Sequence, residues 1–230
     1  MRSFEEIYAK AAERKGGPEA LERLIAEHRP KSQAELAATP DDRWLAGITR
    51  VVFQAGFNWR VVENKWPGFE AAFHGFDPKL NAAMSDDELD AHLKDARIIR
   101  NGAKVASVRT NAQFLVDLAK EHGSAAKFFA DWPDGDFVGL LDVMKARAVR
   151  CAGETAMRFF RNMGKPAFIT TRDVSAALVE AGALAKAPTG KKDYQAVQAA
   201  FNRWSDESGR DLTVISRVLA MSTGPQHAEM

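Results

Sequence analysis

An aromatic segment, Phe53 to Trp59, carries the residue types best suited to binding a planar ligand. It reads Phe-Gln-Ala-Gly-Phe-Asn-Trp, with aromatic residues on both sides of a glycine. Aromatic faces stack on nucleobases, typically for about 1–3 kcal/mol per base. Gln54 adds an amide, which needs hydrogen-bond partners if it is buried. From spacing alone, a core role for the rings is the favoured interpretation, and a base-binding cleft is the alternative.

Basic side chains are concentrated in two stretches, although the chain as a whole is almost neutral. Its 230 residues carry 32 Lys or Arg against 31 Asp or Glu, a net charge of +1. A nucleic acid would therefore be held by a local patch rather than by the overall field. Between Val143 and Arg172 only Glu154 opposes the basic residues Lys145, Arg147, Arg150, Arg158, Arg161, Lys165 and Arg172. The second stretch contains Lys94, Arg97, Arg100, Lys104 and Arg109, and solvated helix faces are the alternative interpretation of both.

The cysteine and histidine content argues against disulfide and metal chemistry. Cys151 is the only cysteine, which excludes an intrachain disulfide and fits a reducing cytosol. A structural zinc site needs about four Cys or His ligands. The histidines are scattered along the chain, at His28, His74, His92, His122 and His227. We therefore expect neither a metal site nor a cofactor.

The apolar pattern does not suggest a membrane protein. The first residues, Met1 to Glu6, are acidic and amphipathic and lack the apolar region of a signal peptide. No apolar run approaches the roughly 18 residues that a membrane-spanning helix needs. We expect a cytoplasmic protein without membrane association.

Helical spacing of apolar residues runs through almost the whole chain. Asp41 and Asp42 follow a Thr-Pro pair that reads as the cap of a helix through Val52. Gly56 interrupts that helix, and Asn58 can cap the next one. We find no alternating strand pattern of useful length and no internal repeat. The pattern therefore predicts an all-α protein in which the aromatic segment is a turn between two helices.

Two further breaks divide the later part of the chain. Residues 131–136 read Asp-Trp-Pro-Asp-Gly-Asp, a loop that is the best candidate for a hinge between two lobes. Gly164, Lys165 and Pro166 form a second sharp turn between helices. Thr170 or Thr171 is expected to cap the helix that follows.

Several ordered segments resemble the 3-methyladenine DNA glycosylase I family. Gln54 to Trp59 is similar to the family's Gln-Ala-Gly-Leu-Ser-Trp, and Phe76-Asp77-Pro78 is similar to its Phe-Asp-Pro. Asp95 to Arg100 resembles its Asp-Ala-Gly-Ile-Ile-Arg, and Gly164 to Leu184 resembles its helix-hairpin-helix more weakly. The resemblance divides the chain into an N-terminal extension (1–40), a family-like core (41–190) and C-terminal helices (191–230).

The resemblance implies an all-helical, two-lobed helix-hairpin-helix DNA glycosylase. Such enzymes extrude a damaged nucleotide into a pocket. They then hydrolyse the bond between base and deoxyribose and leave an abasic site, the first step of base excision repair. An alkylated purine is already a good leaving group, because N-alkylation weakens this bond. The implied partner is double-stranded DNA with an alkylated base such as 3-methyladenine, and we expect a monofunctional, monomeric enzyme.

The resemblance also implies roles for individual residues. Trp59 takes the position of the aromatic residue that stacks on the flipped base, with Phe53, Gln54 and Asn58 beside it. Phe57 takes the position of an apolar wedge between bases. The Gly164–Thr171 hairpin would hold a DNA phosphate with its backbone amides, and an ordinary interhelical turn is the alternative. The expected contacts with the DNA backbone are Gly164, Lys165, Thr170, Thr171, Arg100, Lys104 and Arg161.

The chain departs from the family at several functional positions. The family's base-reading glutamate lies eight residues before the tryptophan, where this chain has Val51. The family's zinc-binding residues at the two termini have no counterparts, and an acidic helix with only Tyr8 replaces its tyrosine-rich segment. Glu63 lies one helical turn beyond Trp59 on the same face and is a candidate substitute for the lost carboxylate. The alternative is that Glu63 faces water and pairs with Lys65 or another neighbour.

No other catalytic residue is assigned, and three interpretations of the chain stay open. The first is an active alkylpurine glycosylase with an altered pocket. The second is a catalytically inactive DNA-binding or lesion-sensing relative, which the valine at position 51 favours. The third is a helical interaction module without a role on nucleic acids.

Overall fold

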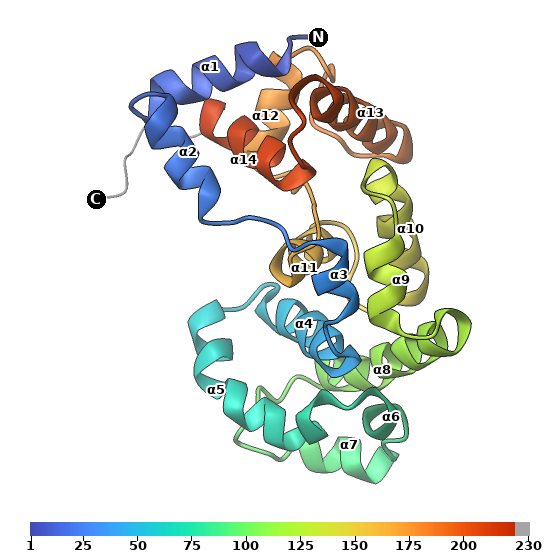
Figure 1. The fold of residues 1–230 in the computed structure, drawn as a ribbon. Helices are drawn as coiled ribbons and strands as arrows, with labels where there is room; N and C mark the ends of the chain where they lie inside the picture. The colour runs from blue at the N-terminus through green and yellow to red at the C-terminus, as the bar shows by residue number, and fades with distance from the viewer. Residues whose placement is uncertain (224–230) are drawn as a thin grey trace. The chain divides into compact units, whose positions relative to one another are not determined.

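The computed structural model of the protein describes residues 1–223, and every regular element within that range is a helix (Figure 1). The all-α prediction is confirmed. Residues 224–230, which include His227 and the end of the predicted C-terminal helices, lie outside the described part of the chain. Among the described helices, none combines the length and apolarity that crossing a membrane requires.

The chain divides into two compact units, and each is assembled from segments that are distant in sequence. The central unit comprises Ser32–Trp132 and Leu140–Met163. The terminal unit comprises Met1–Lys31, Pro133–Gly139 and Gly164–Met230. The chain passes between the units inside the predicted hinge loop, residues 131–136. Hinge motion at this loop stays a prediction.

The central unit contains the aromatic turn and most of the basic stretches. Helix α4 contacts α5, α8, α9 and α11 in this unit. Its helices are α3 (Gln33–Ala37), α4 (Asp41–Gln54), α5 (Trp59–Ala72), η1 (His74–Phe76), α6 (Pro78–Ala82), α7 (Asp86–His92), α8 (Gly102–His122), α9 (Ala125–Asp131) and α11 (Glu154–Met163). Helix α10 (Phe137–Arg147) begins in the terminal unit and continues in this one.

Helix α4 is held in place by the burial of one apolar face and by the carboxylate of Asp41 at its N-terminus. Trp44, Ile48 and Val52 recur every four residues and are almost completely buried. Complete burial of a large apolar side chain contributes about 1.5–3 kcal/mol. The Asp41 carboxylate accepts hydrogen bonds from the first two amides of α9, at 3.1 and 2.9 Å. These amides have no partner within their own helix, so the carboxylate stabilises both helices.

An aromatic cluster holds α5 against the segments around it. Trp66 stacks on Phe69 and Phe76, with ring centroids 5.4 and 5.3 Å apart. Gly68 allows the chain before α8 to approach closely, because a Cβ atom there would lie 2.5 Å from the Arg97 carbonyl oxygen. The turn that precedes α5 is therefore attached to a rigid helix.

The terminal unit brings the two ends of the chain together. Its helices are α1 (Phe4–Lys15), α2 (Pro18–Ala26), η2 (Asp134–Asp136), α12 (Arg172–Glu180), α13 (Lys191–Ser208) and α14 (Leu212–Thr223). Helix α1 packs against α2, α13 and α14, and α12 also packs against α14. Residues 1–31 thus share a core with the C-terminal helices, whereas residues 32–40 of the expected extension belong to the central unit.

Candidate functional site

The predicted turn lies between α4 and α5, and its backbone is fixed at both helix ends. The carbonyl oxygen of Gln54, the last residue of α4, accepts a hydrogen bond from the Phe57 amide at 3.0 Å. Gly56 has a φ of +68°, a left-handed conformation that residues with side chains rarely adopt. Asn58 caps α5 by accepting from the Arg60 amide at 3.0 Å. The side chain of Asn58 therefore shapes the turn.

The aromatic residues of the turn have different environments. Trp59 is 58% exposed and Phe57 is 49% exposed, which is unusual for side chains of this size. Phe53 is fully buried and packs edge-on against Phe69, with ring centroids 4.7 Å apart. The expected base contact is therefore not available to Phe53, because its ring belongs to the core. The rings of Phe57 and Trp59 are exposed enough to meet a ligand, although the Arg60 guanidinium lies over the Trp59 ring, 5.6 Å from its centroid.

A line of polar contacts joins α4 to α5 beside the turn. The Gln54 side-chain amide donates to Glu63 Oε1 at 2.9 Å, and Arg50 Nε lies 3.6 Å from the same oxygen. The Arg50 guanidinium also lies over the Trp66 ring, 4.1 Å from its centroid. Trp66 Nε1 in turn donates to Glu70 Oε1 at 3.0 Å. We call this line of five side chains the polar seam.

The polar seam ends in a bidentate ion pair. The Arg43 guanidinium donates to both carboxylate oxygens of Glu70, at 2.9 and 3.1 Å, and to the Gly75 carbonyl at 2.7 Å. Burial by itself would raise the pKa of Glu70. The hydrogen bonds and charge of Arg43, together with Trp66 and Arg50, outweigh burial and lower that pKa. Glu70 is therefore an ionised, structural carboxylate.

Glu63 is the candidate base reader, and its carboxylate is partly free. It lies four residues after Trp59 in the same helix and its side chain is 33% exposed. Its partners are on α4 rather than at Lys65, whose amino group donates to the Ala96 carbonyl at 2.6 Å. Both contacts of Glu63 use Oε1, and Oε2 has no hydrogen-bond partner among residues 1–223. This oxygen can accept from a ligand.

Lys104 contacts the backbone of the turn. Its Nζ donates to the carbonyl oxygens of Phe53 and Ala55, at 3.1 and 2.8 Å. Burial lowers the pKa of Lys104, and the nearby charge of Arg150 lowers it further. The expected role of Lys104 as a ligand of the DNA backbone is not supported, because its amino group is already bound within the protein.

A short loop after α10 places Arg150 near Lys104. Asn111, which is buried in α8, accepts from the Val149 amide at 2.7 Å and donates to the Val149 carbonyl at 3.0 Å. Arg150 follows with a φ of +60°, which is uncommon for a residue other than glycine. Its side chain is exposed. The paired contacts of Asn111 explain how the loop maintains this conformation.

The predicted phosphate-binding hairpin has fewer free amides than expected. In the terminal unit, the Ala167 amide donates to Thr213 Oγ1 at 3.0 Å and the Ile169 amide donates to Ser216 Oγ at 3.2 Å. Both acceptors lie on α14. Lys165 is 2% exposed and pairs with Asp134 at 3.1 Å. These two amides and Lys165 are therefore unavailable to a DNA phosphate, contrary to expectation.

The other predicted contacts with the DNA backbone have mixed environments. The Gly164 carbonyl accepts from the Lys31 amide at 2.8 Å. Thr171 caps α12 by accepting from the Val174 amide at 3.3 Å, so its hydroxyl has a structural role. Thr170 is half-buried, with its hydroxyl 3.4 Å from that of Tyr194. Arg161 is half-buried near the end of α11, and Arg100 is exposed without an ion-pair partner among the described residues.

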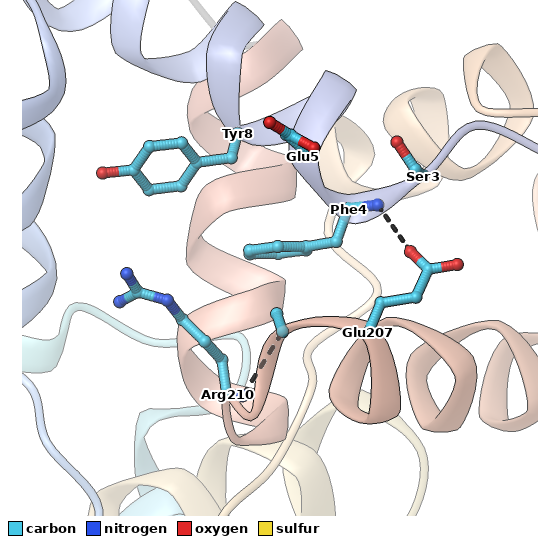
Figure 2. Close-up of a pocket in the computed structure, with 7 residues that line it drawn as sticks. Ser3, Phe4, Glu5, Tyr8, Glu207 and Arg210 are labelled. Atoms are coloured by element: carbon cyan, nitrogen blue, oxygen red, sulfur yellow. Dashed lines mark hydrogen bonds between the residues drawn. The ribbon is translucent and has the colours of Figure 1, made fainter.

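A separate surface pocket lies in the terminal unit. The pocket has a volume of about 520 Å³. Figure 2 shows Phe4, Tyr8 and Arg210 around it. Several of its polar groups are already bound within the protein: Glu207 accepts from the Phe4 amide at 2.8 Å, and both Tyr8 and Arg210 donate to Glu22 outside the pocket. This pocket is therefore a weaker candidate for a binding site than the exposed aromatic turn.

The described residues contain no group of three or more His, Cys, Asp or Glu side chains placed to hold a metal ion. Cys151 is buried, and burial raises the pKa of its thiol to about 12. A thiol that stays protonated at neutral pH is a poor nucleophile. We therefore assign it no chemical role.

Sequence reasoning missed three residues that shape the site. Arg50 belongs to the polar seam, Asn111 anchors the loop of Arg150, and Arg60 lies over the Trp59 ring at 5.6 Å from its centroid. Arg50 precedes Gln54 by four residues, so the helical spacing itself placed the two side chains on one face. The contact of Asn111 with Val149 joins residues far apart in the chain and left no local signal.

A protein-family model matches the part of the chain that contains this turn. Residues 39–170 match the model of the family described as methyladenine glycosylase, which includes the turn and the whole polar seam. Among curated proteins, the chain is 38% identical over 65 residues to DNA-3-methyladenine glycosylase 1 of Escherichia coli strain K12. It is 36% identical over 67 residues to DNA-3-methyladenine glycosylase of Haemophilus influenzae. These alignments cover 28% and 29% of this chain, and 35% and 36% of the two relatives.

Solved structures show the same fold. One is a variant of 3-methyladenine DNA glycosylase I in complex with 3-methyladenine, with a TM-score of 0.52 and 16% sequence identity. The match covers 63% of this chain and 86% of that structure. At this identity the likeness establishes the fold alone.

Proposed function

The chain belongs to the methyladenine glycosylase family, and on this premise we propose that it is a monofunctional DNA N-glycosylase. Its proposed substrate is double-stranded DNA that contains an alkylated purine similar to 3-methyladenine. It would flip that nucleotide, hydrolyse the bond between base and deoxyribose, and leave an abasic site for base excision repair. The observation that carries the proposal is the exposed Trp59 ring on a turn with a fixed backbone.

The proposed chemistry needs binding and charge stabilisation more than a strong base. An N-alkylated purine is cationic, so it departs as a neutral base when the glycosidic bond breaks. Water then adds to the sugar carbon and loses a proton. A cationic ring is attracted to the face of an indole, by about 0.5–2 kcal/mol depending on desolvation. Trp59 supplies such a face.

Glu63 is the group that we propose reads the base. Val51, at the position of the family's glutamate, is 4% exposed and has no polar atom in its side chain. Glu63 offers a carboxylate oxygen on the helix that begins with Trp59. A carboxylate can accept hydrogen bonds from an exocyclic amino group, and it also attracts a cationic ring. Base recognition would thus be moved from α4 to α5.

The exposed side chains around the turn suggest how DNA is held. Phe57 is the proposed wedge that fills the space left by the flipped base. Arg60, Arg100 and Arg150 are exposed cations of the same unit and are the proposed phosphate ligands. We expect the enzyme to act as a cytoplasmic monomer.

The second candidate function is a catalytically inactive relative that binds damaged DNA. The buried valine at position 51 favours it, because the family's base-reading group is lost. Both functions use the same turn, and they differ in whether the base is released.

An excision assay separates the two functions. Duplex DNA treated with a methylating agent would be incubated with the protein, and released bases and abasic sites would be measured. Release of a methylated purine supports the glycosylase. Salt-dependent binding to the damaged duplex without release would support the inactive relative. The absence of both would exclude a role on alkylated DNA.

A further inference from the structure

We propose that Lys104 is a positioning residue that holds the exposed aromatic turn in its binding geometry. It does so from within the protein and is not a ligand of DNA. Only the functional part of this proposal rests on the glycosylase activity proposed above. The structural part concerns the protein alone.

The contacts of Lys104 lie where the turn begins. Its amino group binds the carbonyl oxygens of Phe53 and Ala55, at 3.1 and 2.8 Å. These belong to the last turn of α4 and to the residue that ends it. The last four carbonyls of a helix have no partner within the helix, and lysine side chains are suited to bind them. One side chain thus replaces two of the missing partners.

The position of Lys104 is unfavourable for a cation that lacks such partners. It lies in the first turn of α8, where the helix dipole disfavours positive charge. The nearby Arg150 adds a second positive charge. The negative end of the α4 dipole offsets both effects at the observed location. Two of the three donors of the ammonium group are used, so little is left for a phosphate.

The two carbonyls that Lys104 binds lie close in the chain to the residues that we expect to meet the base. Gly56, with its left-handed backbone, directly follows Ala55, and Phe57 follows Gly56. Trp59 opens α5 only four positions after Ala55. Loss of the ammonium group would leave two carbonyls without this partner and loosen the segment that carries both exposed rings.

Hydrogen exchange of the free protein tests the structural part. We expect Lys104→Met to speed exchange of the hydrogen-bonded amides of Ala55, Phe57 and Arg60 by about tenfold or more, since local opening becomes easier. Lys94→Met removes the same charge from an exposed position in the same basic stretch and should leave these amides unchanged. Lys104→Arg should restore part of the protection. Unchanged exchange in a folded Lys104→Met protein would overturn the proposal, whatever the activity.

Binding to two duplexes tests the functional part. If Lys104 is a positioning residue, Lys104→Gln should weaken the binding and the excision of an alkylated base. The affinity of Lys104→Gln for undamaged duplex should then equal that of Lys94→Met. If Lys104 instead binds a DNA phosphate, Lys104→Gln should lose the same affinity for both duplexes. The salt dependence of binding should then fall by about one phosphate contact. The second result would overturn the proposal. If the wild-type protein excises nothing, the exchange experiment still decides whether Lys104 holds the turn.

Discussion

The side-chain amide of Gln54 lies 2.9 Å from Glu63 Oε1, which joins the last residue of α4 to the second turn of α5. Through this contact the exposed aromatic turn is connected to the rest of the polar seam and to the half-buried pair of Arg43 and Glu70. Two sets of contacts therefore hold the turn: the polar seam binds the side chain of Gln54, and Lys104 binds backbone carbonyls where the turn begins. A defined surface for a planar ligand is the consequence.

Glu63→Gln tests the proposed base reader. Glutamine retains an oxygen that can accept from Gln54, so the fold should tolerate the change. A hydrogen bond to a charged group contributes about 1.5–3 kcal/mol, so we expect affinity for the alkylated duplex to fall by roughly 10- to 150-fold. Asp90→Asn makes the same chemical change at an exposed position of the same unit and is the matched control. Equal excision by both variants would remove Glu63 from the mechanism.

Trp59→Ala should affect the ligand and leave the protein stable. Because the ring is 58% exposed, its removal should change the unfolding free energy by less than about 0.5 kcal/mol. Loss of base stacking should cost about 1–3 kcal/mol of lesion binding. Competition binding with an alkylated and an undamaged duplex measures the effect, and Trp59→Phe should retain part of it. A large loss of stability would show that the ring is part of the core.

Thr213→Val tests the internal use of the hairpin amides. Valine has nearly the same shape but cannot accept the hydrogen bond of the buried Ala167 amide. The Thr213 hydroxyl also donates to the Ala167 carbonyl at 3.3 Å. A typical hydrogen bond contributes about 0.5–1.5 kcal/mol, and urea unfolding should show at least a loss of this size. Thr110→Val, at an exposed position, should change stability little. A neutral Thr213→Val would mean that the amide has another partner, such as water.

The Arg43–Glu70 pair predicts how stability depends on pH. The folded state lowers the pKa of Glu70, so the pair contributes stability above the unfolded pKa of about 4.3. That contribution is lost as the pH falls through the folded pKa. Because the pair is partly exposed, Glu70→Gln should cost about 1 kcal/mol at pH 7.

The difference between wild type and Glu70→Gln should then shrink as the pH is lowered below 4. Urea unfolding at several pH values measures it. Glu13→Gln, at an exposed position on α1, is the control for a general effect of removing one carboxylate. A difference that grows as the pH falls would contradict the sign of the shift.

The sequence predicted the helices and the turn because their signals are local. Apolar spacing, Gly56 and the cap at Asn58 are all read within a few residues. The exposure of Trp59 and the burial of Phe53 were not predictable, since helical spacing does not show which side of a turn faces the core. Lys104 was assigned to DNA because its charge is visible in the sequence. Its two carbonyl partners lie 51 and 49 residues away in the chain, so the sequence alone does not reveal them.

In the terminal unit, the partners of the hairpin residues could likewise not be predicted from the local sequence. Lys165 belongs to a basic stretch, yet it is buried against Asp134, 31 residues earlier. The resemblance implied that backbone amides of the Gly164–Thr171 hairpin hold a phosphate, but side chains of α14 bind the amides of Ala167 and Ile169. Local pattern predicts a turn well, whereas the partners of its polar groups depend on tertiary packing.

The most direct test of the proposed function is a single-turnover excision experiment on one duplex with one alkylated adenine. Wild type, Trp59→Ala and the control Asp90→Asn would be compared, and release of the free base would be followed. We predict release by wild type and by the control, with a rate for Trp59→Ala lower by roughly 5- to 150-fold. No release by wild type, or release that is independent of Trp59, would contradict an alkylpurine glycosylase that acts at this turn.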